Sequence, residues 1–197
     1  MKNCRQLLIP TLCILLASLF LAVLPTDAEA EIYNDTVRLH ILAASDSEED
    51  QTVKLAVRDA LLNEFGDRLS AVKDPAEAKR LAQELLPEIR ACANRVLMEN
   101  GFSYGAEVTL TEEDYPTRYY EDFSMPAGRY LSLRVLLGGG NGHNWWCVVF
   151  PPLCTSLACE KAEEYYSFSE RELIERGDVT VRFKLLEMLS SLDGKKP

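Results

Sequence analysis

The spacing of apolar residues divides the N-terminal half of this chain into one strand and two helical stretches. Residues 36–43 alternate between two sets of side chains and are rich in β-branched types, which is typical of a β-strand. Apolar residues then recur every three or four positions over 48–65, which predicts an amphipathic helix that Gly66 ends. A second helical stretch covers residues 74–101, and Pro87 within it either kinks the helix or starts a new one.

After this point the period changes to two, which predicts strands. The alternating runs cover residues 107–111, 117–123, 129–137 and 145–150. Asn141-Gly142 lies in the glycine-rich link between the last two runs, and this dipeptide predicts a hairpin. Residues 170–176 and 179–192 return to a helical pattern. We therefore expect an α+β fold, with a mainly antiparallel sheet of about five strands that helices cover on one face.

Residues 1–30 have the layout of a secretory signal peptide. Two basic residues precede an uncharged apolar run over 7–24, and Ala28-Glu29-Ala30 offers a small-residue cleavage site. An uncleaved membrane anchor is the alternative, because an apolar helix of this length nearly spans a bilayer. In both cases we expect residues 31–197 to form a single α+β domain outside the cytoplasm.

The chain is acidic, with a formal net charge of −10, and the charges of the N-terminal segment cancel one another. A domain of this charge repels phosphate backbones and anionic lipid, which argues against nucleic-acid binding and favours a protein partner. The sequence contains no C-x-x-C, no H-E-x-x-H, no acidic calcium loop and no phosphate-binding loop. We therefore expect no metal, no cofactor and no small-molecule substrate.

The most distinctive stretch runs from Trp145 to Cys154. Successive strand residues face opposite sides, so Trp145 and Trp146 point to different faces of the sheet. Either one tryptophan stays exposed as an interface anchor, or helices cover one and the C-terminal segment covers the other. Cys147 and Cys154 flank Pro151-Pro152, and they either close a short disulfide loop or remain free thiols.

Neither histidine forms a convincing catalytic set. His143 precedes Cys147 by four residues, which places the two about 13 Å apart on an extended chain, so we interpret His143 as a solvated turn residue. His40 is followed by Ser45 and Asp46, but such trios arise by chance, and a half-buried histidine beside a helix cap explains them. We expect no enzyme. A small secreted hydrolase that uses His40 or a cysteine, and a structural or adhesive protein, are the alternatives.

Three segments carry a resemblance to a known family. They are Arg38-Leu39-His40-Ile41-Leu42-Ala43 with Ser45-Asp46-Ser47, Tyr115-Pro116-Thr117-Arg118 with Pro126-Ala127-Gly128, and Asn144-Trp145-Trp146-Cys147-Val148 with Phe150-Pro151-Pro152-Leu153-Cys154. These segments resemble the stage II sporulation protein R family, and the resemblance extends over residues 36–192. Ala44 and His143 stand where that family usually has asparagine and lysine.

The resemblance implies a protein that is made in the forespore and exported into the space between forespore and mother cell. It would act there on the outer side of a membrane-embedded aspartic protease, the pro-sigma-E processing peptidase, which then matures the sigma-E precursor. In this picture the chain is a signal that binds one state of the protease better than another. The contact residues that we expect are Trp145, Trp146, Cys147 and Cys154, followed by Arg38, His40, Asp46 and Arg118.

Overall fold

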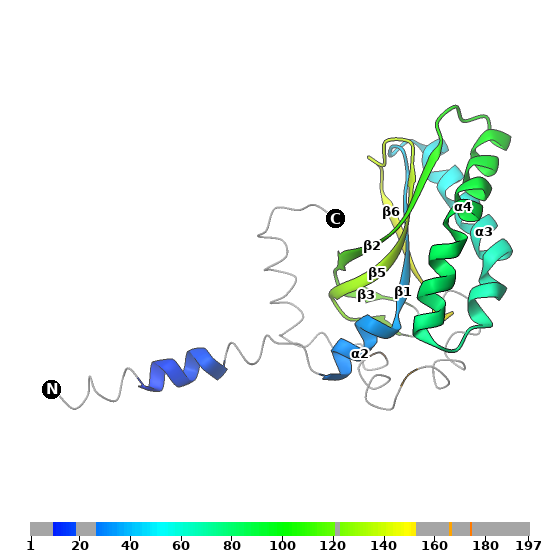
Figure 1. Cartoon of the computed structure of the whole chain (residues 1–197). Helices are drawn as coiled ribbons and strands as arrows, with labels where there is room; N and C mark the ends of the chain where they lie inside the picture. The colour runs from blue at the N-terminus through cyan, green and yellow to red at the C-terminus, as the bar shows by residue number, and fades with distance from the viewer. Residues whose placement is uncertain (1–9, 19–26, 121–122, 153–165, 167–173, 175–197) are drawn as a thin grey trace.

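The fold is a mixed β-sheet with two long helices on one face (Figure 1). The structure is a computed structural model that describes residues 10–18, 27–120, 123–152, 166 and 174. A helix covers residues 10–18. The other elements are α2 (Asp27–Asp35), β1 (Val37–Leu42), α3 (Glu48–Ser70), α4 (Pro75–Glu99), β2 (Ala106–Tyr115), β3 (Arg118–Tyr119), β4 (Ser124–Met125), β5 (Gly128–Leu137) and β6 (Asn144–Phe150). The predicted helices at 170–176 and 179–192 lie outside the described residues, apart from Ile174.

The main sheet has the strand order β2-β5-β1-β6. β1 is parallel to β5 and antiparallel to β6, while β2 is antiparallel to β5. The α+β class is therefore confirmed and α3 and α4 share one face of the sheet, but α2 packs on the other face and the sheet is mixed with four strands. The fifth predicted strand, 117–123, is wrong: β3 is two residues long and pairs with β4 in a separate ribbon. Pro116 has no backbone N–H for a ladder and separates β3 from β2.

The predicted hairpin between the last two strands is also wrong, because β1 lies between β5 and β6. All six residues of β1 are buried, and a strand with two buried faces belongs at the centre of a sheet. The glycine-rich link instead crosses the end of β1, where the N–H of Gly142 donates to the carbonyl of Ala43 over 3.0 Å. A Cβ at Gly142 would lie 2.1 Å from the Ser45 carbonyl oxygen, so this crossing requires glycine.

The helix predicted to end at Gly66 continues to Ser70. Phe65 and Leu69 are both buried on its inner side, and their burial outweighs the cost of about 1 kcal/mol for a glycine within a helix. Ser47 caps the start of α3 by accepting a hydrogen bond from the N–H of Asp50. α4 runs through Pro87 as one helix and ends at Glu99, with Asn100 as its C-cap and Gly101 at a φ of 82°.

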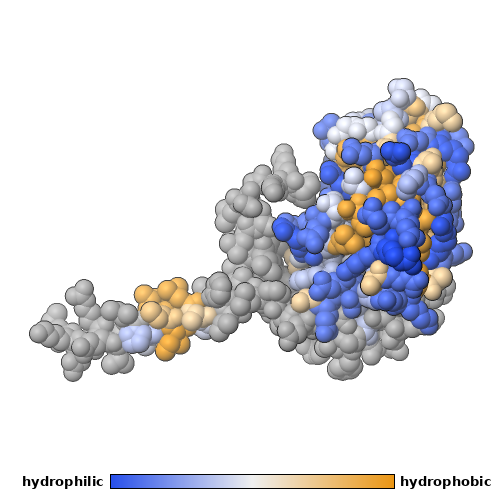
Figure 2. All heavy atoms as spheres, in the orientation of Figure 1, coloured by the Kyte–Doolittle hydropathy of each residue, from blue (hydrophilic) through white to orange (hydrophobic). Residues whose placement is uncertain are grey.

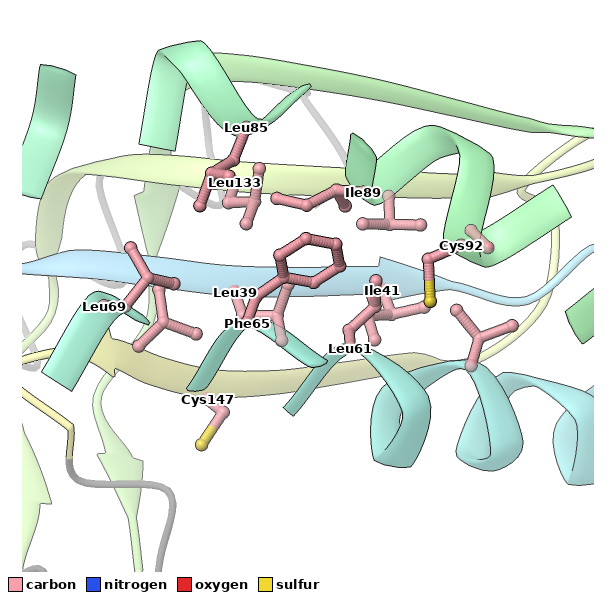
Figure 3. Packing of buried hydrophobic residues seen from close by; sticks show 14 of the residues in the cluster. Leu39, Ile41, Leu61, Phe65, Leu69, Leu85, Ile89, Cys92, Leu133 and Cys147 are labelled. Atoms are coloured by element: carbon pink, nitrogen blue, oxygen red, sulfur yellow. The ribbon is translucent and has the colours of Figure 1, made fainter. Parts of the chain in front are cut away.

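The main core lies between the sheet and the helices α3 and α4. In Figure 3, Phe65 lies over β1 beside Leu39, and side chains from α3 and α4 surround it. Cys92 is buried in the same cluster, where burial first of all raises the pKa of its thiol to about 11. Its place on the inward stripe of the predicted helix is therefore confirmed. Apolar side chains make up this face of the sheet almost completely, so hydrophobic burial accounts for its stability.

A smaller cluster covers the opposite face of the sheet. Ile32 and Tyr33 of α2 pack there, and the Tyr33 ring meets the Tyr130 ring edge-on at 5.0 Å. Tyr166 also belongs to this cluster, and its hydroxyl lies 2.8 Å from the hydroxyl of Thr36. α2 extends across the expected cleavage site, and Ile32 and Tyr33 lie on its mature side.

The helix over residues 10–18 presents apolar side chains to solvent, and Figure 2 shows it as an apolar patch. Leu12, Ile14, Leu15 and Leu16 are all more than half exposed. Within the part of the chain that the structure describes, no helix combines the length and the apolar character that a membrane span requires.

Candidate recognition site

The face of the sheet opposite α3 and α4 gathers cationic side chains around a tryptophan. We call these residues the arginine–tryptophan cluster: Arg38, His40, Glu113, Arg118, Arg134 and Trp146. The register explains the grouping, since His40 of β1 lies opposite Trp146 on β6 and opposite Arg134 on β5. Directly opposite residues in a sheet share one face and come within contact distance. Strand pairing therefore brings together residues that lie far apart in the sequence.

Arg38 is the most unusual member because its side chain is completely buried, with a relative exposure of 0%. The guanidinium carbon lies 4.3 Å from the centre of the Tyr115 ring and 5.0 Å from that of Tyr130. Nη2 donates to the Tyr120 hydroxyl over 2.8 Å, while Nε and Nη1 have no hydrogen-bond partner among the described residues. The two rings offset part of the cost of burying this charge, but unpartnered donors remain costly.

Glu113 connects two other members of the cluster. His40 Nδ1 lies 2.9 Å from one of its carboxylate oxygens, and Arg134 Nε lies 3.5 Å from the other. Burial by itself raises the pKa of Glu113, but hydrogen bonds with His40 and Ser132 and the charge of Arg134 bring it below its usual value. Glu113 is therefore held as a carboxylate between His40 and Arg134.

Arg118 and Trp146 form the accessible side of the cluster. The guanidinium carbon of Arg118 lies 3.4 Å from the centre of the Trp146 ring, and both residues are partly exposed. The Trp146 ring also lies 5.4 Å from that of His40. Four of the expected contact residues, Arg38, His40, Arg118 and Trp146, therefore lie together on one face.

The other expected contact residues do not join them. Trp145 packs against the helix-facing core, and Arg58 of α3 lies over its ring at 5.2 Å. Cys147 is buried on the same side, as Figure 3 shows, and Cys154 lies outside the described residues. A disulfide between these two cysteines thus stays a prediction. Both tryptophans are half-buried, Trp145 on the helix-facing side of the sheet and Trp146 on the other side.

Asp46 lies at the carboxyl end of β1, on the loop that precedes α3. It accepts a hydrogen bond of 2.6 Å from the N–H of His143, and the ring of His143 also contacts it. His143 is exposed in a turn, as predicted, but Asp46 fixes its position. This contact ties the β5–β6 link to the start of α3, so we assign Asp46 a structural role.

A buried polar network beside Asp46 was missed by reasoning from sequence. The Asp50 carboxylate accepts hydrogen bonds from Ser45 and from Tyr104, and these bonds lower its pKa. Lys54 is 5% exposed, and its ammonium group donates to the carbonyl of His143 over 3.0 Å. Burial lowers the pKa of Lys54. Charged residues near the start of a helix usually face solvent, so only the tertiary contacts of Asp50 and Lys54 reveal this role.

The described residues do not assemble a nucleophile with a base. His40 Nε2, which would take the proton of a nucleophile, has no hydrogen-bond partner there, and the Ser45 hydroxyl donates to Asp50 instead. Cys147 faces the helices, on the other side of the sheet from His40. Within the described residues, no three His, Cys, Asp or Glu side chains are grouped as metal ligands would be.

Comparison with known proteins shows to which family the chain belongs. The family model described as stage II sporulation protein R matches residues 33–159. The chain belongs to the stage II sporulation protein R family. It is 39% identical over 123 residues to stage II sporulation protein R of Bacillus subtilis (strain 168). The match covers 62% of this chain and 55% of that protein, so it spans about half of the relative's length. No solved structure matches.

The matched region begins within α2 and includes all strands of the main sheet. Every member of the arginine–tryptophan cluster therefore lies in the part of the chain that the family shares. The observed membership agrees with the resemblance seen in the three sequence segments, two of which supply Arg38, His40 and Trp146.

Proposed function

We propose that this chain is a secreted signalling protein of endospore formation that activates the membrane-embedded pro-sigma-E processing aspartic protease. It is exported from the forespore and triggers maturation of sigma-E in the mother cell. The observation that carries the proposal is membership of the stage II sporulation protein R family over residues 33–159. The relative in Bacillus subtilis bears the name of a sporulation protein.

Export into the space between the two cells fits the N-terminal segment. Residues 1–30 combine basic residues, an apolar run and a small-residue cleavage site. Among the residues of α2 whose burial is described, 30–35, the first that is buried in the second cluster is Ile32, just after that site. Cleavage after Ala30 would therefore retain the packed part of α2.

In this proposal the arginine–tryptophan cluster is the docking site for the protease. Tryptophan and arginine are the residue types that most often dominate binding energy at protein interfaces. The chain would bind the active state of the protease better than the inactive one and so shift the population toward activity. Trp145 and Cys147 face the helices and would support this surface rather than touch the partner.

We further propose that Cys147 pairs with Cys154. Cys147 is in a disulfide-bonded form, and the described residues hold only two other cysteines, Cys13 and Cys92, both free. Cys154 is the nearest remaining cysteine in sequence, and disulfides are favoured outside the cytoplasm. Mass spectrometry of a non-reduced chymotryptic digest tests the pairing, because Leu153 and Leu157 offer cleavage sites between the three cysteines, and a linkage of Cys147 to Cys4 or Cys159 would contradict it.

Reconstitution in growing cells tests the main proposal. The full chain is co-expressed with the protease and the sigma-E precursor, and shortening of the precursor is followed by immunoblot. The expected result is cleavage that requires the chain, the protease and export. The control is the same chain without residues 2–24, which should accumulate in the cytoplasm and produce no cleavage. Absence of cleavage with export confirmed would contradict the proposed activation.

A secreted hydrolase is the second candidate, and the pairing of His40 with Glu113 is the observation in its favour. The variant Cys147→Ser separates the two functions, and His40→Gln excludes a hydrolase that uses His40 if full activity remains. A hydrolase that uses one of them loses its turnover by about a thousandfold or more. A signal retains most of its effect in Cys147→Ser wherever the variant is exported and folded.

A further inference from the structure

We infer that the arginine–tryptophan cluster accepts the carboxylate of an aspartate or glutamate side chain from its protein partner, beside Trp146. This inference rests on the proposed function, since it names the chemistry that the partner presents to the docking site. The partly exposed Arg118 and Arg134 would meet the carboxylate, and the charge of the buried Arg38 would support them.

The first observation is a local reversal of charge. The chain as a whole carries a net charge of −10. Within the cluster, however, the two arginines Arg38 and Arg134 stand with one carboxylate, that of Glu113, among the described residues. Glu113 is already engaged by His40 and Arg134. A positive site within an acidic protein attracts an anionic group at that point while the rest of the surface repels polyanions.

The second observation is a pair of buried donors that the described residues do not satisfy. They are Nε and Nη1 of Arg38. Arg38 is 0% exposed, so bulk water does not satisfy them as it does a surface group. Buried polar groups without partners are rare in native proteins and need an explanation. A nearby anion lowers the cost of holding the Arg38 charge in this position.

The chemistry favours a side-chain carboxylate over other anions. A guanidinium group is planar and matches a carboxylate with two parallel hydrogen bonds. Trp146 offers apolar area beside the charge, which suits the methylene groups of glutamate or aspartate. Phosphate-rich partners such as nucleic acid or anionic lipid carry many charges, and the acidic remainder of the chain would repel them.

A fluorescence titration tests the inference without the protease. The full chain with Trp145→Phe leaves Trp146 as its only tryptophan. The probe is an acetylated, amidated tetraglutamate peptide, added in about 0.15 M salt, which screens charges more than about 8 Å apart. We expect a saturable change in Trp146 emission that the matching tetraglutamine peptide does not produce.

Three variants make the result specific. Arg118→Gln should weaken peptide binding about tenfold, because it removes a charge-assisted contact, and Arg118→Lys should fall between it and the parent. Arg58→Gln is the matched control: it removes the arginine that lies over the other tryptophan, and binding should not change. Thermal unfolding of each variant verifies that the fold is intact.

Several outcomes would overturn the inference. They are the absence of a saturable response, an equal response to tetraglutamine, or unchanged binding by Arg118→Gln. A failure of the proposed function is separate: the wild-type chain would then not trigger precursor cleavage, whatever the peptide does. If the wild-type chain triggers cleavage and a folded, exported Arg118→Glu variant does so equally well, the carboxylate site is wrong while the proposed function stands.

Discussion

Trp145 and Trp146 are adjacent in the sequence, yet they belong to two very different faces of the sheet. Trp145 packs against the apolar core below α3, with Arg58 over its ring. Trp146 lies on the opposite face, with Arg118 over its ring and the buried Arg38 and His40 beside it on β1. An arginine lies over each ring, so the two environments differ in their other neighbours. These are apolar core residues for Trp145, and the polar residues Arg38 and His40 for Trp146.

The helix-facing side of the sheet needs only hydrophobic burial to explain it. On the opposite side, four polar residues are buried: Thr36, Arg38, His40 and Ser132. Burial of polar side chains costs free energy that hydrophobic packing alone does not offset. Folded proteins usually break the rules of stable packing where a site is required for function. We therefore attribute stability chiefly to the first face and recognition to the second, and each prediction below tests that division.

The largest effect is expected in the helix-facing core. Phe65→Ala removes a ring that is 2% exposed at the centre of the packing in Figure 3. The free energy of unfolding should fall by about 3–5 kcal/mol, as measured by urea denaturation. Precursor cleavage by the remaining folded chain should be normal. A large loss of activity per folded molecule would show that this face also carries function.

The two tryptophans offer a direct comparison. Trp145→Ala and Trp146→Ala should each cost about 2 kcal/mol, less than a fully buried ring because both side chains are partly exposed. Only Trp146→Ala should abolish precursor cleavage when the amounts of exported, folded chain are matched. Thermal unfolding and immunoblots together check this. If Trp146→Ala loses its fold in proportion to its activity, Trp146 is a core residue.

The sequence predicts the elements of this fold better than their arrangement. The period of the apolar residues locates β1, α3, α4 and the long strands, because it reports which side of each element is buried. The period of the apolar residues does not report which strands lie next to one another in the sheet. Asn141-Gly142 is typical of a hairpin, but β1 is buried on both sides and lies between β5 and β6. The central position of β1 depends on the packing of the whole sheet, and this outweighs the tendency of a local Asn-Gly dipeptide to form a hairpin.

The same limit applies to the recognition site. Alternation predicts that Trp146 points away from Trp145, and the family segments indicate Arg38, His40 and Arg118. Glu113 was missed, because only the register of β2, β5 and β1 brings it to His40. Register is set by the packing of complete strands, so no single segment of the sequence reveals it.

Glu113→Gln tests how firmly the polar face is held together. It removes the carboxylate that lies between His40 and Arg134, and should cost about 1–2 kcal/mol at neutral pH. The pKa of Glu113 is lowered in the folded state, so its contribution is complete above the ordinary pKa of 4.5. The contribution is lost as pH falls through the lower folded pKa.

Urea denaturation of the wild type and of Glu113→Gln between pH 7 and pH 3 measures this contribution. The difference between the two proteins should shrink once the pH is below 4.5. Asp114→Asn is the control, since Asp114 forms an exposed ion pair with Arg129, for which less than about 1 kcal/mol is expected. A difference for Glu113→Gln that is constant over the whole range would mean that its charge contributes nothing to folding.

The smallest effect on stability is expected from a substitution at Arg38, although its side chain is completely buried. Arg38→Met keeps an unbranched side chain of similar length between the rings of Tyr115 and Tyr130, where sulfur packs favourably. It removes one hydrogen bond to Tyr120 together with a buried charge, and these changes oppose each other. The free energy of unfolding should therefore stay within about 1 kcal/mol of the wild type, while binding of the tetraglutamate peptide falls. A decrease of more than about 3 kcal/mol in the free energy of unfolding would show that groups within the folded chain already compensate the charge of Arg38. The second face would then contribute to stability as the first does, and its role in recognition would lose this support.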